Sequence, residues 1–323
     1  MDTVRLGRTE LQVTPICFGT WQLGGDWGDP EADGARQAIR RARELGVNFF
    51  DTAQGYGWGA AERMLADALS DELQADRDGV VLATKGGLRM TEDGLVRDSS
   101  PAWLRQGVEE SLQALGVDHI DLYQVHWPDE ATPFEQTGQA LAGLVAEGKI
   151  RHVGVSNFDA RQMAALEGTL PVETLQPPYH LFRRDIEDDV LPWCAEHDVG
   201  VLVYAPLGHG LLTGAFDEDH AFPDDDWRAG SDLFAGEAFH TNLDKVRALG
   251  DLARERGHTV SQLAIAWTIS HPAVQVAIVG ARKPHHFEES AGAADIRLDD
   301  DDRAQIDRIM AGAVPLGGPS PEM

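Results

Sequence analysis

Short runs of apolar residues recur along the chain, and several of them are unbroken by polar positions. Such runs are typical of strands that are buried on both faces of a parallel sheet. They predict eight strands, at residues 16–20, 48–52, 80–85, 121–126, 152–156, 174–176, 201–205 and 276–280. Amphipathic helical patterns lie between them, for example from Ala35 to Leu45 and from Leu104 to Leu115. Eight strands that alternate with helices predict an α/β chain folded as a closed (β/α)₈ barrel, the TIM barrel.

The segments outside this alternation complete the expected architecture. Residues 4–14 predict a β-hairpin that closes the bottom of the barrel. Residues 207–241 combine Gly, Pro, Asp and aromatic residues without a helical period, so we expect a long loop on the face where the strands end. Residues 312–323 are rich in Gly and Pro, and we expect them to be poorly ordered. Because no linker divides the chain, the sequence predicts a single domain over residues 1–323.

Acidic residues outnumber basic ones by 54 to 27, which gives a formal net charge of −27. A chain this acidic repels the phosphates of nucleic acids and anionic membranes, so we expect neither as a partner. Its acidic runs, such as 224–226 and 299–302, suit either an interaction tail or a surface adapted to high salt. A tail would form one block without apolar residues, whereas here the charge is spread along the chain and lysine is almost absent. The pattern therefore favours a halophilic protein.

The two cysteines, Cys17 and Cys194, have neither the number of a disulfide framework nor the spacing of a metal site, although they could form a single bridge. We therefore expect a reduced, cytoplasmic protein. The N-terminal residues lack the regions of a signal peptide, and no run approaches the roughly 18 apolar residues of a membrane span. We expect no bound metal, because ligand spacing is missing among His209, His220, His240, His285 and His286.

Four ionisable residues lie at or just after three consecutive predicted strands. Asp51, Lys85 and His126 end the second, third and fourth strands, and Tyr56 lies in the glycine-flanked loop after the second. In a (β/α)₈ barrel the loops after the strands meet at one face, so the four side chains can converge there. Each residue also has an ordinary alternative, which is a helix cap for Asp51, a surface aromatic for Tyr56, a solvated strand end for Lys85 and a structural role for His126. Their joint occurrence favours a functional site.

Together the four residues are suited to moving a proton. A free tyrosine has a pKa of about 10, which is too high for ready proton donation at neutral pH. We expect a buried ammonium, that of Lys85, to lower the pKa of Tyr56, and we assign Asp51 as the carboxylate that its burial requires. A neutral His126 would hold a substrate carbonyl through its N–H or help to relay the proton.

Six stretches of the sequence resemble, in order, the successive signatures of the aldo-keto reductases: FFDTAQGYGWGAAE, VLATKGG, DLYQVHWPD, HVGVSNFDARQM, LQPPYHLF and VLVYAPLGHGLLTG. The likeness runs from about Leu6 to Leu298. It implies a barrel oxidoreductase that interconverts a carbonyl compound and an alcohol with a nicotinamide cofactor, and the absence of a Rossmann GxGxxG turn agrees with it. The family's catalytic tetrad falls on Asp51, Tyr56, Lys85 and His126, with Tyr56 as general acid and the hydride coming from the nicotinamide C4.

By the same resemblance, the cofactor would be bound by Ser156, Asn157, Gln176, Tyr204, Leu207, Gly208, Gly210, Gly280, Arg282, Lys283 and Glu289. Ser156, Asn157 and Gln176 would hold the nicotinamide carboxamide, while Tyr204 would stack on the ring. A cap for the helix that starts near Asp159 is an equally good local interpretation of Asn157. Backbone amides around the two glycines of APLGHG would receive the pyrophosphate.

The pair Arg282 and Lys283 precedes a predicted helix that begins at Pro284, so two cations and a positive helix end coincide. The pair matches the place where the family binds the adenosine 2′-phosphate, and a guanidinium suits a bidentate phosphate contact. We therefore expect NADP(H) rather than NAD(H). His286 and Ser290 depart from the Arg and Asn that are frequent in the family near the adenine.

Trp21, Trp58 and Trp127 flank motif residues on three loops, and we expect them to form an aromatic wall for a small-molecule substrate, with a core position as the alternative. Two rival functions remain at this stage. A regulatory barrel that binds the cofactor as a redox sensor, as channel-associated relatives do, would keep the tetrad and differ in turnover. An isomerase or lyase barrel would leave the cofactor-loop motifs without an explanation.

Overall fold

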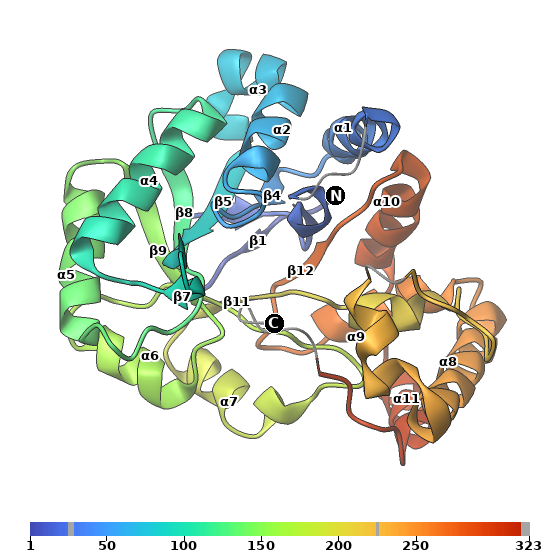
Figure 1. The fold of residues 1–323 in the computed structure, drawn as a ribbon. Helices are drawn as coiled ribbons and strands as arrows, with labels where there is room; N and C mark the ends of the chain where they lie inside the picture. Colours follow the sequence, from blue (N-terminus) through green and yellow to red (C-terminus); the bar gives the residue numbers. More distant parts are fainter. Residues whose placement is uncertain (25–28, 224–225, 318–323) are drawn as a thin grey trace.

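Eight parallel strands close into a barrel at the centre of the molecule (Figure 1). The computed structural model describes residues 1–24, 29–223 and 226–317. Within them the barrel consists of β3 (Ile16–Gly19), β4 (Phe49–Asp51), β5 (Val81–Gly86), β8 (Ile120–Val125), β9 (Ile150–Ser156), β10 (Thr174–Gln176), β11 (Gly200–Val203) and β12 (Val276–Val279). The barrel closes where β12 pairs with β3, with Ile278 opposite Cys17. The predicted (β/α)₈ barrel is confirmed, and each of the eight strands lies on a predicted run.

Helices surround the barrel and bury their apolar faces against it (Figure 1). In the described residues they are α1 (Asp29–Glu44), α2 (Ala60–Ala68), α3 (Ser70–Ala75), α4 (Pro101–Leu115), α5 (Phe134–Ala146), α6 (Ala160–Glu167), α7 (Val190–Glu196), α8 (Gly236–Glu255), α9 (Val260–Ile269), α10 (Pro284–Ala291) and α11 (Asp300–Met310). Helix α4 begins and ends at residues that are typical of helix ends. Ser100 caps it, Pro101 is its first residue, and Gly116 ends it with a φ of 65°. No helix in these ranges is both long and apolar enough to cross a bilayer.

The N-terminal hairpin closes the bottom of the barrel, as predicted. Its strands β1 (Val4–Arg5) and β2 (Gln12–Val13) pair antiparallel, and Leu6 and Val13 are fully buried with the apolar side chains that fill the barrel interior. Gly7 allows the close approach, because a Cβ there would lie 2.0 Å from the backbone nitrogen of Gly200. The interior of the barrel is therefore solid at this end, and a cavity can open only at the other.

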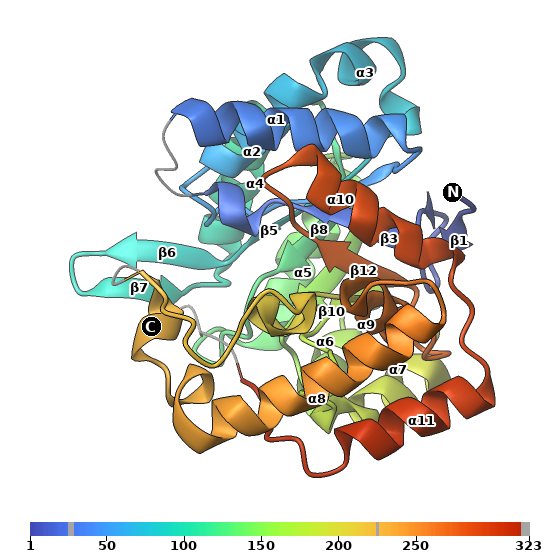
Figure 2. The same ribbon diagram turned by 90° about the vertical axis from the view of Figure 1, so that its right-hand side faces the viewer.

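The opposite end carries a second hairpin that the sequence analysis did not predict (Figure 2). Its strands β6 (Leu88–Thr91) and β7 (Gly94–Arg97) follow β5 directly and project beyond the barrel, away from β1. The turn between them depends on Gly94, whose φ is 115°. Four-residue strands on a surface carry too few apolar positions to stand out as a pattern.

The predicted loop over residues 207–241 is correct for most of its length but too long at its end. It contains the short 3₁₀ turns Gly208–Thr213, Trp227–Gly230 and Asp232–Phe234, after which α8 already begins at Gly236. The first buried residues of α8 are Phe239, Asn242 and Leu243, so only one buried apolar residue of this helix lies before residue 241. A helical repeat of apolar positions cannot be recognised from a single position.

Residues 312–317, which the sequence predicted to be poorly ordered, make specific contacts in the structure. Leu316 is 1% exposed and donates its backbone N–H to the carbonyl oxygen of Phe182 at 2.9 Å, while Val314 exchanges two hydrogen bonds with the side chain of Asn242. The segment is fixed because it satisfies a buried asparagine and buries one leucine. Residues 318–323 lie outside the described residues, as do Asp224 and Asp225 of the acidic run 224–226.

Candidate active site

Lys85 and Asp51 form a buried ion pair inside the barrel. Asp51 ends β4, Lys85 lies on the neighbouring strand β5, and Lys85 Nζ is 2.6 Å from Asp51 Oδ1. The same ammonium donates to the carbonyl oxygen of Thr52 at 2.9 Å and lies 3.4 Å from the hydroxyl of Tyr56. All three N–H donors of Lys85 are thus directed at named oxygens. The alternatives of a solvated Lys85 and a helix-capping Asp51 are both wrong.

His126 follows β8 and packs against Tyr56. The two ring centroids are 5.6 Å apart in an edge-to-face arrangement. The backbone N–H of His126 donates to the carbonyl oxygen of Gly86, which anchors the residue at the end of β8. Its Nδ1 is buried and has no hydrogen-bond partner in the described part of the chain. The structure thus brings the four predicted residues together, with Tyr56 in contact with both Lys85 and His126.

Burial controls the ionisation of the group. Burial and the nearby charge of Lys85 hold the pKa of His126 well below its ordinary value, so the imidazole is neutral at pH 7. Burial by itself lowers the pKa of Lys85, but the combined effect of Asp51 and Tyr56 outweighs it and the pKa is raised. Lys85 is therefore a cation throughout the physiological range.

The expected direction for Tyr56 is wrong. Burial raises the pKa of its phenol, and the charge of Lys85 opposes this rise without reversing it. The ammonium of Lys85 favours the phenolate, but removing the phenolate from water has the larger effect. Tyr56 is accordingly fully protonated at neutral pH, with a cation in contact with its oxygen.

The second oxygen of Asp51 is held by two glutamines. Gln176 Nε2 donates to Asp51 Oδ2 at 2.9 Å, and Gln124 Nε2 donates to the same oxygen at 3.3 Å. Gln124 was not singled out from the sequence. The available signal is its position two residues before His126 on β8, which gives both side chains the same side of the strand. A polar residue at such an inward position of a barrel strand needs a partner.

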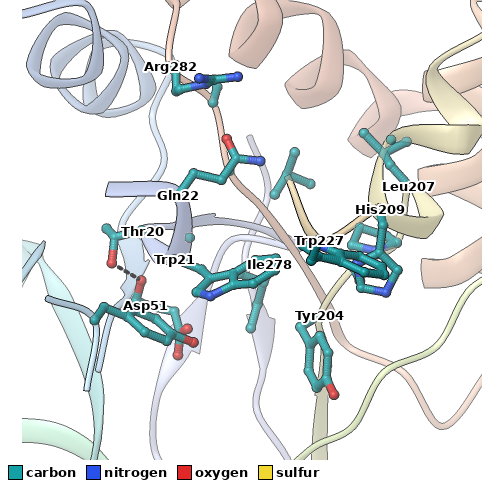
Figure 3. Close-up of a pocket in the computed structure, with 18 of the residues that line it drawn as sticks. Thr20, Trp21, Gln22, Asp51, Tyr204, Leu207, His209, Trp227, Ile278 and Arg282 are labelled. Carbon is teal, nitrogen blue, oxygen red and sulfur yellow. Dashed lines mark hydrogen bonds between the residues drawn. The ribbon is translucent and has the colours of Figure 1, made fainter. Parts of the chain in front are cut away.

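Asp51, Tyr56, His126 and Gln176 line a cavity of about 1520 Å³ that opens at the C-terminal ends of the strands. Figure 3 shows Asp51 and Trp21 toward one end of this cavity and Arg282 toward the other. Most of the predicted site residues line it: Asp51, Tyr56, His126, Ser156, Asn157, Gln176, Tyr204, Leu207, Gly210, Gly280, Arg282, Lys283, Glu289, Trp21 and Trp127. Lys85 lies behind Tyr56, in contact with its hydroxyl.

Besides Lys85, two predicted residues do not line the cavity. Trp58 has a φ of 49° between two positive-φ glycines and is 40% exposed, because this turn carries its side chain out to solvent. Gly208 is buried beside Leu316 and His180 rather than at the cavity surface. The expected contributions of Trp58 to the substrate wall and of Gly208 to the cavity are corrected accordingly.

Ser156, Asn157, Gln176 and Tyr204 form one hydrogen-bonded cluster on the cavity wall. Asn157 Nδ2 donates to the carbonyl oxygen of His126 at 3.1 Å and to Ser156 Oγ at 3.0 Å, while its Oδ1 accepts from the hydroxyl of Tyr204 at 2.9 Å. Ser156 Oγ donates to the carbonyl oxygen of Gln176 at 2.8 Å. The cap of α6 is Asp159, so the capping role for Asn157 is wrong.

At the far end of the cavity, Arg282 and Lys283 occupy the exposed turn before α10. Lys283 is the residue that precedes the helix, and Pro284 is its first residue, as the sequence predicted. The two cations therefore lie next to the first turn of α10, where backbone N–H groups have no partner within the helix. This arrangement suits an anionic group.

A family model with the description "Aldo/keto reductase family" matches residues 15–311, which is nearly the whole chain. The chain belongs to the aldo-keto reductase family. As an aldo-keto reductase it is an oxidoreductase that acts on small carbonyl compounds with a nicotinamide cofactor, as the resemblance of its motifs implied.

Named relatives are enzymes. The glycerol dehydrogenase of Gluconobacter oxydans is 36% identical, with a TM-score of 0.90, and the match covers 100% of this chain and 98% of that one. An aldo/keto reductase of Klebsiella pneumoniae, solved with NADP and acetate, is 33% identical, with a TM-score of 0.75 and coverage of 100% and 99%. The NADH-specific methylglyoxal reductase of Escherichia coli K12 is 32% identical over 97% of this chain and 99% of its own. These matches do not favour the regulatory-barrel alternative.

This aldo-keto reductase also has cavity residues that the sequence analysis missed. Leu88 and Leu95 come from the β6–β7 hairpin. His209 and Trp227 come from the long loop, with ring centroids 5.2 Å apart, and they face the cavity together (Figure 3). Arg97 lies over the ring of Trp127, 4.8 Å from its centroid, and orients that wall. Loop residues such as these have no periodic signal, so their place in the wall depends on the folded loop.

Proposed function

We propose that the protein reduces an aldehyde or ketone to an alcohol, or catalyses the reverse reaction, with NADP(H) as cofactor and Tyr56 as the proton donor. The observation that carries this proposal is the contact of Lys85 with both Asp51 and Tyr56 in a buried site beside a large cavity. The arrangement places a protonated phenol, a fixed cation and a neutral imidazole around one point of the cavity wall.

Tyr56 holds its proton until a substrate oxygen needs it. As negative charge develops on the carbonyl oxygen, the phenol donates its proton to that oxygen and becomes a phenolate. Lys85, at 3.4 Å from the phenol oxygen, stabilises the phenolate, and Asp51 keeps Lys85 charged in its buried position. The raised pKa of Tyr56 keeps its hydroxyl protonated at neutral pH.

His126 orients the carbonyl beside Tyr56. Because the imidazole is neutral, it has one N–H donor, and we assign that donor to the carbonyl oxygen. A cation at this position would compete with the phenol for the developing charge. The edge-to-face contact between the rings holds the imidazole beside the phenol.

The cavity wall fits a nicotinamide carboxamide. When bound, the reduced cofactor supplies the hydride that the carbonyl carbon receives. In the Ser156–Asn157–Gln176 cluster the donors are engaged within the protein, and lone pairs on oxygens remain for an amide N–H. We assign the face of Tyr204 to the nicotinamide ring, since Tyr204 lines the cavity and its hydroxyl is anchored to Asn157.

We propose NADP(H) over NAD(H) because Arg282 and Lys283 line the far end of the same cavity. The Klebsiella structure with NADP supports this assignment, whereas the NADH-specific relative shows that the family also contains the opposite preference. Leu207, Gly210, Gly280 and Glu289 line the same cavity and are assigned to the cofactor. Gly208 is not assigned to it, because it lies below the surface and its N–H donates to the carbonyl oxygen of Ala205.

We further propose that residues 1–323 act as a single domain in a reducing cytoplasm. The continuous barrel and the buried, unpaired state of Cys17 and Cys194 support this proposal. A panel of aldehydes, ketones and alcohols, assayed in both directions with both cofactors at molar salt, tests the function directly. We expect NADPH-dependent reduction of at least one carbonyl class, and cofactor binding without turnover across the panel would contradict the proposal.

A further inference from the structure

Gln124 is fully buried inside the barrel and does not line the cavity. It lies on β8 in register with Lys85 on β5 and Gly154 on β9. Its Nε2 donates to Asp51 Oδ2 at 3.3 Å, and its Oε1 accepts a hydrogen bond from Gln176 Nε2, also at 3.3 Å. Gln124 therefore touches both a member of the proton-donating group and a residue of the cavity wall.

These contacts fix the side-chain amide of Gln176. Its Nε2 carries two protons, and they are directed at Asp51 Oδ2, at 2.9 Å, and at Gln124 Oε1. Because the carboxylate of Asp51 is paired with Lys85 and accepts only, the amide nitrogen of Gln176 must face it. The group that Gln176 retains for a ligand is its Oε1, an acceptor.

The neighbouring cavity residues, Ser156 and Asn157, also offer a ligand hydrogen-bond acceptors. The hydroxyl proton of Ser156 is donated to the carbonyl oxygen of Gln176, and the amide protons of Asn157 are donated to His126 and Ser156. What remains on all three side chains is unused acceptor capacity. Such a set is complementary to an –NH₂ group and not to a carbonyl or methyl group at the same place.

We propose that Gln124 is a positioning residue that holds the amide of Gln176 with its Oε1 toward the cavity, where it accepts a hydrogen bond from the carboxamide –NH₂ of the nicotinamide. This inference rests on the proposed function, since it concerns the same cofactor site. It goes beyond that function because it makes the recognition of the amide group depend on Gln124, a residue that orients Gln176 without contacting the ligand itself.

The experiment compares two ligands that differ at that amide. NADP⁺ carries the carboxamide, whereas in 3-acetylpyridine adenine dinucleotide phosphate a methyl group replaces the –NH₂. Dissociation constants for both are measured by isothermal titration calorimetry at fixed molar salt, for the wild type, Gln124→Met and Tyr123→Phe. Methionine matches the volume of glutamine without its hydrogen bonds. Tyr123 is the adjacent buried residue of β8, and its hydroxyl has no partner in the described part of the chain.

We expect the wild type and Tyr123→Phe to prefer NADP⁺ over the acetyl analogue by the same factor. In Gln124→Met the affinity for NADP⁺ should fall by about threefold to tenfold, the effect of one hydrogen bond, while that for the analogue stays the same. A ratio of the two constants that is unchanged in Gln124→Met, or equal binding of the two ligands to the wild type, would overturn the inference while leaving the proposed reaction intact. A wild type that binds neither ligand would overturn both.

Gln124→Leu, measured in parallel, provides a second apolar substitution if methionine prevents folding. Circular dichroism and the thermal midpoint establish that each variant is folded before titration. A residue that only fills space would weaken both ligands equally or neither, so the ratio separates positioning from packing.

Discussion

The ammonium of Lys85 lies 2.6 Å from the carboxylate of Asp51, and both side chains are almost completely removed from solvent. Removing one partner of such a pair leaves a buried charge without compensation, which costs about 3–5 kcal/mol. We expect Asp51→Asn to lower the free energy of unfolding by about this amount, as measured by urea denaturation at molar salt. Asp51→Asn combined with Lys85→Met should recover most of the stability but not the turnover. Equal stability of the wild type and Asp51→Asn would show that the ion pair with Asp51 does not compensate for the burial of the Lys85 ammonium.

Glu62 is a buried carboxyl group on α2 that forms no ion pair within the described residues. Its Oε1 accepts a hydrogen bond from Thr84 at 2.6 Å, and the hydroxyl of Ser111 is a second polar neighbour of the carboxyl group. Burial raises the pKa of Glu62, and the hydroxyl groups of Thr84 and Ser111 oppose the rise. The folded state therefore binds this proton more tightly than the unfolded state, and stability should fall as pH rises from about 4.3 through the pKa of the folded protein.

We accordingly expect Glu62→Gln to be more stable than the wild type at pH 8 and to lose less stability between pH 5 and pH 8. Urea denaturation at the two pH values measures both effects. Glu92→Gln, at the exposed turn of the β6–β7 hairpin, is the matched control and should follow the wild type. A wild-type protein whose stability rises over this pH interval in the same way as that of Glu62→Gln would contradict the account of this group.

Arg282 stands at the adenosine end of the proposed cofactor site. We expect Arg282→Ala to lower kcat/KM for NADPH by about tenfold to hundredfold, the effect of a charged hydrogen bond to phosphate, and to leave the value for NADH nearly unchanged. Steady-state kinetics with both cofactors at one salt concentration measure the ratio. Arg254→Ala, which removes an arginine whose side chain is 74% exposed on α8, is the control for net charge. A wild type that prefers NADH would contradict the assignment of Arg282 and Lys283 to a 2′-phosphate.

The net charge of −27 should make the fold depend on salt. Part of the acidic run 299–302 has a structural role, since Asp299 caps α11, whereas Asp300 is 99% exposed and, within the described residues, pairs only with Arg303 of the same helix. At 1 M salt the screening length falls to about 3 Å, so repulsion between exposed carboxylates is largely removed. We expect the thermal midpoint and the activity to rise with NaCl into the molar range. Full stability and activity in dilute buffer would contradict the halophilic interpretation.

The sequence predicted the barrel and the central four residues because both depend on strands. A buried strand is a short apolar run, and polar residues at its C-terminal end, such as Asp51 and His126, stand out against it. The order of eight runs then constrains the fold more strongly than any single run. The hairpin at 88–97 and the start of α8 were missed, because short surface strands and a single buried position carry no period.

The errors within the site have a different origin. Gln124 lies in a strand whose pattern indicates only burial, and its function depends on which strand pairs with which across the barrel. The pKa of Tyr56 was expected to fall because the neighbouring cation was inferred from the sequence, whereas the degree of burial was not. Trp58 was placed in the cavity by its neighbours in the motif, but the two glycines around it turn the chain outward.

The most direct test of the proposed mechanism is the turnover of Tyr56→Phe compared with its cofactor binding. Phenylalanine keeps the ring that packs against His126 and removes only the hydroxyl that Lys85 contacts. We predict that kcat for carbonyl reduction falls by at least about a hundredfold, while the dissociation constant for NADP⁺ changes by less than about threefold. Near-full turnover of Tyr56→Phe would show that another group donates the proton, and would contradict the account.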